Sequence, residues 1–408
     1  MNELQIETSR LRELLPNVAA KELEDVFSYV TWSVLCEPGD GLAGMLVQTL
    51  GSTMALKNEL QNATPSVVKR QLIDAGLSSE EINEYGPFES TFQIGRERWK
   101  SRLSFSSVQR AIQSMHNMRG FILTPLSQQW PEQLRDLKFH APMALWVRGT
   151  EFSLSSLSNS VAVVGSRGSS NYGDSATETM TAALVGKNLS VVSGGAYGID
   201  AVAHRTALAL KGNTVAVMAG GVDRLYPTGN KDLLNRIIQT GSVLSELPPG
   251  AIPTKWRFLQ RNRLIAALSQ ATLVVEANWR SGALSTVGHA EKLVRAVYAV
   301  PGPIDSPKSA GTNKLIADRR AELVVDATDF LQQLGKMPIS SIALELPGLG
   351  ALETRVLDAL GYDSLEVSEI CSSAGLTRDE ARLGLSNLEL DGLILRRGSA
   401  WMKTQTTL

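Results

Sequence analysis

The chain has 408 residues, enough for two or three domains and at least one large buried core. Its 40 Lys and Arg residues nearly balance 41 Asp and Glu residues. The formal net charge of −1 excludes a globally cationic nucleic-acid coat, so any anion site must be a local patch. A hydrophobic content of 43% indicates a folded globular protein rather than a disordered one.

Cysteine usage and the N-terminal segment bear on the cellular compartment. Cys36 and Cys371 are the only cysteines, which excludes a disulfide framework and a cysteine-based zinc site and fits a reducing cytosol. The first residues lack the basic and apolar regions of a secretory signal, and no apolar run approaches the length of about 18 residues that a membrane helix needs. The sequence therefore predicts a cytoplasmic protein with no membrane association.

Residues 1–125 have a mostly helical pattern. Within them, Trp32–Leu46 predicts a helix, a tight glycine turn and a second helix. Modules of this shape either place turn amides against a DNA phosphate or only pack against a neighbour, and both interpretations stay open. Residues 126–157 are expected to form an extended bridge into the next domain.

Residues 158–332 alternate between apolar runs and helical patterns. One helix is expected to begin near a capping box at Ser175 and another after the N-cap residue Asn230. Alternation of this kind predicts a doubly wound α/β domain with a mostly parallel sheet and ligands at the carboxyl ends of its strands. The expected strands are Val161–Val164, Ser190–Val192, Thr214–Ala219, Val243–Leu244, Thr272–Val275, Ala296–Val300 and Glu322–Val325.

Residues 333–349 are expected to be a linker, and residues 350–408 a winged helix. Its helices are predicted at Thr354–Leu360, at Val367–Ser373 and after a capping box at Thr377–Glu380, followed by a hairpin around Arg397 and Gly398. The third helix carries two arginines against three acidic residues, whereas helices that read the major groove are usually more basic. This domain is therefore expected to contact a protein or to bind duplex DNA weakly.

The loop after the first strand of the α/β domain begins at Gly165 and suggests phosphate binding at a helix N-terminus. Arg167 stands where a dinucleotide fingerprint needs a glycine, and the strand ending at Ser193 lacks the acidic residue that grips a ribose. No nicotinamide or flavin cofactor is therefore expected. Arg167 with Ser166 and Ser170 would instead suit a phosphate within a polymer backbone.

Other strand ends offer further phosphate donors. Ser193, Gly194 and Gly195 predict an anion nest, with Asp200 as a helix cap and His204 as a structural residue. A later loop offers donors at Ser281, Gly282 and Thr286. A small ligand needs one such loop, so a row of them favours a chain of phosphates.

The segment Lys255–Arg263 carries four cations and lies in a stretch without acidic residues between Glu246 and Glu276. Trp256 and Phe258 interleave with the cations. This pattern is typical of single-stranded nucleic-acid binding, in which cations follow phosphates and rings stack on bases. The alternative is a solvated helix face with both aromatic side chains in the core.

Together these motifs resemble the DNA-processing protein A family, also called Smf, over nearly the whole chain. Each motif is weak alone, but their order and spacing along one sheet make the resemblance specific. The motifs are Gly165–Arg167 with Tyr172 and Gly173, Ser193–Asp200, Gly221–Pro227, Ser245–Gly250, Phe258–Ala266, Ser281–Thr286 and Val300–Pro303.

The resemblance implies a helical N-terminal domain of sterile-alpha-motif or helix-hairpin-helix type, a Rossmann-like core and a C-terminal winged helix. It implies binding and protection of incoming single-stranded DNA, loading of the RecA recombinase during natural transformation, and a homodimer formed through the core. Carried over by position, Arg167 and Lys255 would grip phosphates and Phe258 would stack on a base. Arg261, Asn262 and Arg263 belong to the family's Arg-Asn-Arg motif.

The protein is expected to be a non-catalytic mediator, with no catalytic residue, metal or cofactor. Two other functions are the alternatives. The first is a nucleotide phosphoribohydrolase of the lysine-decarboxylase-like type. That class needs a Pro-Gly-Gly-x-Gly-Thr-x-x-Glu run, whereas the corresponding strand end here is Asn278–Thr286 without the glutamate. The second is a pure protein adaptor, which the acid-free basic segment disfavours.

Overall fold

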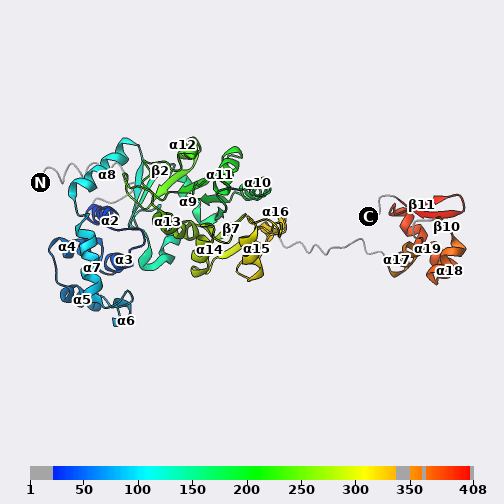
Figure 1. Ribbon diagram of the computed structural model, residues 1–408, viewed down its shortest axis with the longest axis horizontal. Helices are drawn as coiled ribbons and strands as arrows, with labels where there is room; N and C mark the ends of the chain where they lie inside the picture. Colours follow the sequence, from blue (N-terminus) through cyan, green and yellow to red (C-terminus); the bar gives the residue numbers. More distant parts are fainter. Residues whose placement is uncertain (1–21, 337–349, 361–363, 405–408) are drawn as a thin grey trace. The chain divides into compact units, whose positions relative to one another are not determined.

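The computed structural model describes residues 22–336, 350–360 and 364–404 (Figure 1). The contacts divide the chain into two compact units, Met1–Met337 and Pro338–Leu408. The finer domain boundaries expected near residues 125, 157, 332 and 349 stay predictions. Among the helices that the structure describes, none combines the length and apolar character that crossing a bilayer requires.

The N-terminal part of the first unit is helical, as expected. The predicted helix, turn and helix are α2 (Leu23–Leu35) and α3 (Gly41–Leu50). Gly39 supplies the positive φ of +75° that the turn needs, and the Asp40 carboxylate caps α3 by accepting from the Ala43 amide at 3.2 Å. The remaining helices are α4 (Ser52–Leu60), α5 (Pro65–Asp74), α6 (Ser79–Ile82), α7 (Phe88–Lys100) and α8 (Phe105–Asn117).

A nine-stranded sheet forms the centre of the first unit, in the order β1-β2-β6-β5-β4-β3-β7-β8-β9. All seven apolar runs that were expected as strands are strands, and they pair in parallel. The doubly wound, mostly parallel α/β fold is thus confirmed. The parallel strands are β3 (Ser160–Val164), β4 (Ser190–Ser193), β5 (Thr214–Val217), β6 (Ser242–Ser245), β7 (Ala271–Val274), β8 (Ala296–Ala299) and β9 (Glu322–Leu323).

Two further strands extend the sheet in an antiparallel sense. β1 (Phe121–Leu123) pairs with β2 (Leu145–Gly149), and β2 pairs with β6. The segment expected as an extended bridge therefore supplies a sheet strand, together with the 3₁₀ helices η2 (Glu132–His140) and η3 (Leu157–Asn159) and the short helix α9 (Phe152–Ser155).

Helices cover both faces of the sheet because successive strand residues alternate between them. Ala162 and Val164 pack with α13 (Lys255–Leu268) and α14 (Ala283–Lys292). Val161 and Val163 pack on the other face. That face is covered by α10 (Asn171–Gly186), α11 (Ile199–Ala209) and α16 (Ala327–Gln333), while η4 (Thr228–Asn230), α12 (Lys231–Thr240) and α15 (Ala310–Ala317) complete the unit.

The structure contradicts one predicted helix start and confirms another. The capping box at Ser175 was wrong: α10 begins at Asn171, because the Ser170 hydroxyl accepts from the Gly173 amide at 3.1 Å. Helix α12 does begin after Asn230. The Asn230 side chain nevertheless does not cap it and donates instead to the carbonyls of the glycine-rich loop after β4, at 3.0 Å.

The second unit has the predicted winged-helix elements. Helix α19 (Arg378–Leu390) opens at the expected capping box between Thr377 and Glu380. The other elements are α17 (Ala351–Leu360), β10 (Leu365–Glu366), α18 (Val367–Ala374), β11 (Ile394–Arg397) and β12 (Ala400–Lys403), with the strands in the antiparallel order β10-β12-β11.

Candidate nucleic-acid groove

A groove of about 1300 Å³ opens at the carboxyl ends of the parallel strands. The chain runs from β3 outward to β6 on one side and then returns to β7, which pairs with β3 on the other side. Such a reversal of strand order is where open α/β sheets usually bind ligands. The loops after β3, β5, β6 and β7 all line this cavity, here called the strand-end groove.

The structure brings most of the predicted site residues together in this groove. Those that line it are Gly165, Ser166, Arg167, Lys255, Phe258, Arg261, Asn262, Ser281, Gly282 and Thr286. Ser170, Ser193, Gly194, Gly195 and Arg263 lie outside its lining.

The loop after β3 presents Arg167 at the groove. Its guanidinium carbon lies 4.9 Å from the centroid of the Phe258 ring, and the arginine side chain is exposed. Ser170 is engaged elsewhere, because its amide donates to buried Glu276 at 2.9 Å and its hydroxyl donates to the same carboxylate. In this loop, then, Arg167 is the available phosphate ligand, whereas Ser170 holds the start of α10.

The glycine-rich loop after β4 directs its amides at a carboxylate of the protein itself. The amides of Gly194 and Ala196 donate to Asp200 Oδ2 at 3.1 and 3.3 Å. Asp200 is not the cap of α11, since that position is Gly198. The Ser193 hydroxyl is buried and donates to a β3 carbonyl at 2.7 Å. In this structure the predicted anion nest is therefore filled internally.

Arg261 is a buried structural cation at the base of the groove. Its Nη1 donates to the carbonyls of Gly194 and Val217, both at 2.7 Å. Burial, only partly offset by the charge of Asp200, lowers the pKa of Arg261 to about 10. This arginine ties α13 to the ends of β4 and β5.

The rest of the Arg-Asn-Arg motif is also engaged within the protein. The Asn262 side chain donates to the Gly282 carbonyl at 3.1 Å, which joins α13 to the start of α14. Arg263 is 3% exposed and pairs with Glu246. Arg261 and Arg263, two of the four cations in the segment Lys255–Arg263, therefore bind groups within the protein.

Lys255 and Phe258 line the groove from the first turn of α13. Lys255 is exposed and pairs with no carboxylate in the part of the chain that the structure describes. Arg257 is turned instead toward Glu37, 2.7 Å away. Trp256 is 59% exposed, so it is not a core residue.

Sequence reasoning missed several groove residues. Arg224, Lys231 and Arg280 are exposed cations in its lining, and Tyr226 lies with its ring centroid 5.8 Å from that of Phe258. All four follow strand ends, so the rule that places ligands at carboxyl ends could have singled them out. Asp223 is the exposed acidic residue of the lining, and it lies 3.7 Å from Arg224.

The groove thus combines exposed cations from four loops with an aromatic pair. Cations on a surface of this kind attract phosphates, and exposed rings offer stacking faces to bases. The exposed cations are Arg167, Arg224, Lys231, Lys255 and Arg280. The arrangement has the chemistry to hold a flexible polyanion whose bases are unpaired.

Comparisons with known proteins found two family matches along the chain. Residues 121–335 match the family described as DNA recombination-mediator protein A, and residues 343–398 match the DprA winged helix domain. A putative DNA processing protein DprA of Mycobacterium tuberculosis is 38% identical over 331 residues, covering 76% of this chain and 84% of that protein.

A solved structure shows the same relationship. The X-ray structure of DNA processing protein A from Streptococcus pneumoniae is 30% identical and covers 75% of this chain and 95% of that one, with a TM-score of 0.56. A structure that describes the single-stranded DNA binding mode of DNA processing protein A from Helicobacter pylori is 29% identical and covers 53% of this chain and 96% of that one, with a TM-score of 0.48. Since the first family match alone spans more than half of the 408 residues, the chain belongs to the DNA recombination-mediator protein A family.

Proposed function

We propose that this protein binds single-stranded DNA in the strand-end groove and acts there as a recombination mediator. The observation that carries the proposal is the position of Arg167 over the Phe258 ring, in a groove that presents four further exposed cations. Membership of a family described as recombination mediators supports the same role.

The chemistry of the groove favours a single strand over a duplex. Phe258 and Tyr226 offer ring faces, and a base can stack on them only when it has left its own helix stack. The surrounding cations would follow the phosphates without reading sequence. Binding is therefore expected to be tolerant of sequence and sensitive to salt.

The finer parts of the role rest on the family resemblance. We infer that the protein protects incoming single strands and loads the RecA recombinase onto them during natural transformation, in the cytoplasm and without catalysing a reaction. We also infer a homodimer formed through the α/β core. RecA-dependent strand exchange on coated single strands, with and without this protein, tests the loading step.

Fluorescence anisotropy of a labelled oligo-dT strand, beside its duplex and across a salt series, tests the binding step. The expected result is a clear preference for the single strand that weakens as salt is added. Equal binding of the two, or none, would contradict the proposal. Release of free base from a nucleoside monophosphate would favour the phosphoribohydrolase instead.

A further inference from the structure

The turn between α2 and α3 lies directly against helix α13. A Cβ atom on Gly39 would approach the Gln260 and Arg263 side chains to 3.0 and 3.1 Å, and the Gly39 amide faces Glu246 at 3.4 Å. The Gly39 amide, which could have faced a DNA phosphate, therefore faces a carboxylate of the same unit. The packing interpretation of this turn is the one that the contacts support.

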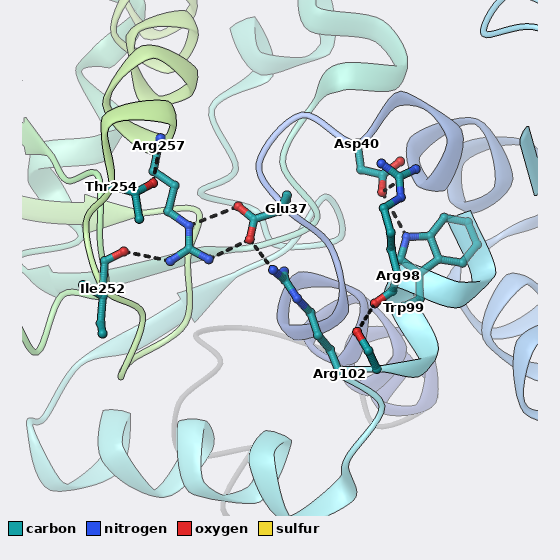
Figure 2. Close-up of polar contacts among 9 residues, drawn as sticks. Glu37, Asp40, Arg98, Trp99, Arg102, Ile252, Thr254 and Arg257 are labelled. Carbon is teal, nitrogen blue, oxygen red and sulfur yellow. Dashed lines mark hydrogen bonds and ion pairs between the residues drawn. The ribbon is translucent and has the colours of Figure 1, made fainter. Parts of the chain in front are cut away.

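Glu37, in the turn between α2 and α3, is joined to α13 by Arg257 and also binds Arg102, which follows α7 in the N-terminal helical part (Figure 2). Its carboxylate accepts from Arg257 Nε at 3.1 Å and from Arg257 Nη2 at 2.7 Å, and it also accepts from Arg102. The side chains of Arg257 and Glu37 are 16% and 35% exposed. A two-point contact of this kind fixes the guanidinium plane as well as its distance.

Arg257, which is held by Glu37, also forms hydrogen bonds to residues at the edge of the groove. Its Nη1 donates to the Ile252 carbonyl at 2.8 Å, and its amide donates to the Thr254 hydroxyl that caps α13 at 3.3 Å (Figure 2). Ile252 and Thr254 line the groove, and Lys255 and Phe258 flank Arg257 on the first turn of α13. The bonds of Arg257 therefore hold the segment from which both groove residues project.

We propose that Glu37 is a positioning residue for DNA binding. Glu37 holds the first turn of α13 through Arg257, so that Lys255 and Phe258 keep their positions in the groove. Glu37 does not itself contact DNA. This inference rests on the proposed function and adds a role for the N-terminal helical region in it.

Positioning and simple electrostatics predict opposite effects for the loss of this carboxylate. Partial burial acts to raise the pKa of Glu37, but the hydrogen bonds from Arg257 and Arg102 outweigh it and hold that pKa below its usual value. The carboxylate is therefore a negative charge near a site for a polyanion. If it acted only through its charge, its removal would strengthen DNA binding.

The test compares oligo-dT affinity across a salt series for Glu37→Ala, Glu37→Gln and Glu37→Asp. We expect Glu37→Ala to weaken binding roughly five- to tenfold, a coupling typical of residues in one network. Because Lys255 loses its position, the salt dependence should become shallower by up to about 0.7, the value of one phosphate contact. Glu37→Asp, which keeps the charge, should bind more tightly than Glu37→Ala. Exposed Glu97 on α7 supplies the matched control, Glu97→Gln, with wild-type affinity.

A double-mutant cycle sharpens the result. Arg257→Ala should weaken binding as Glu37→Ala does, and the double variant should be no weaker than either single one, since both break the same contact. Wild-type or tighter binding by folded Glu37→Ala would overturn the proposal. If the alanine variant does not fold, wild-type or tighter binding by Glu37→Gln would overturn it in the same way. Failure of the wild-type protein to bind oligo-dT would instead overturn the proposed function.

Discussion

The guanidinium of Arg167 lies over the ring of Phe258, with its carbon 4.9 Å from the ring centroid. The two residues follow different strands, since Arg167 comes after β3 and Phe258 lies in the first turn of α13, which comes after β6. They meet because α13 crosses back over the sheet from β6 and packs against β3. A cation over an aromatic face is attracted by about 0.5–1 kcal/mol at an exposed site. The contact places a candidate phosphate ligand and an aromatic ring next to each other in the strand-end groove.

This pairing predicts separable effects of two substitutions. The slope of log affinity against log salt is negative, and Arg167→Ala should make it less steep by about 0.7, the value for one phosphate contact on a single strand. Phe258→Ala should cost about 1–3 kcal/mol of binding free energy, the usual value of one stacked base, with the slope unchanged. Anisotropy titrations of oligo-dT at four or more salt concentrations measure both.

Lys187→Ala is the control for these two variants. Lys187 is exposed beyond the end of α10, away from the strand-end groove, and should bind as wild type does. Equal slopes for Arg167→Ala and wild type would show that Arg167 meets no phosphate.

The buried and exposed cations of α13 should behave differently in unfolding. Arg261→Met leaves the carbonyls of Gly194 and Val217 without their donor and buried Asp200 without its neighbouring charge. Removing one partner of a buried charge typically costs about 3–5 kcal/mol of stability. Lys255→Ala should stay within about 0.5 kcal/mol of wild type in the same urea titration. Comparable losses in the two variants would contradict the structural role given to Arg261.

Buried His204 predicts an acid-sensitive core. Its Nδ1 lies 2.8 Å from the Thr214 hydroxyl, and burial, with smaller effects from Arg261 and Arg205, lowers the pKa of His204 from 6.5 to about 3. Between these values the unfolded state binds a proton that the native state does not, so stability should fall as the pH falls from about 6.5 toward 3.

Urea unfolding of wild type and His204→Gln between pH 4 and 7 measures this linkage. The variant should lose up to one proton of pH dependence, about 1.4 kcal/mol per pH unit. The slope is compared rather than the absolute stability, because the substitution also disturbs packing. Parallel curves would show that His204 does not contribute.

The second unit should be dispensable for single-strand affinity. All residues that line the strand-end groove belong to the first unit, and the first turn of α19 carries Asp379 and Glu380. A chain ending at Met337 is therefore expected to bind oligo-dT within about twofold of the full chain, a difference well below 1 kcal/mol. A tenfold loss would assign a DNA contact to the winged helix.

The parallel strands were predictable because short runs of valine and alanine alternate with helical patterns. The strands β1 and β2 were not, since β1 has three residues and a 3₁₀ helix separates the two. The start of α10 was misplaced because Ser170 and Ser175 are both good N-cap residues, and buried Glu276, distant in sequence, favours the former.

The chemistry of the groove was predictable in part, because ligands gather at strand ends. The accessibility of each cation was not, since it depends on partners far away in the chain. Arg257 meets a carboxylate at Glu37, and Arg261 meets carbonyls of two strand ends. An acid-free stretch of sequence therefore still folds into a segment with most of its charge engaged.

Oligo-dT binding by the double variant Arg167→Ala with Lys255→Ala tests most directly whether the strand-end groove is the DNA site. Both side chains are exposed in the groove, so the fold should persist in circular dichroism and urea unfolding. Single-strand binding by this variant should be abolished at moderate salt. Wild-type binding by the folded double variant would contradict the assignment of the strand-end groove as the DNA site.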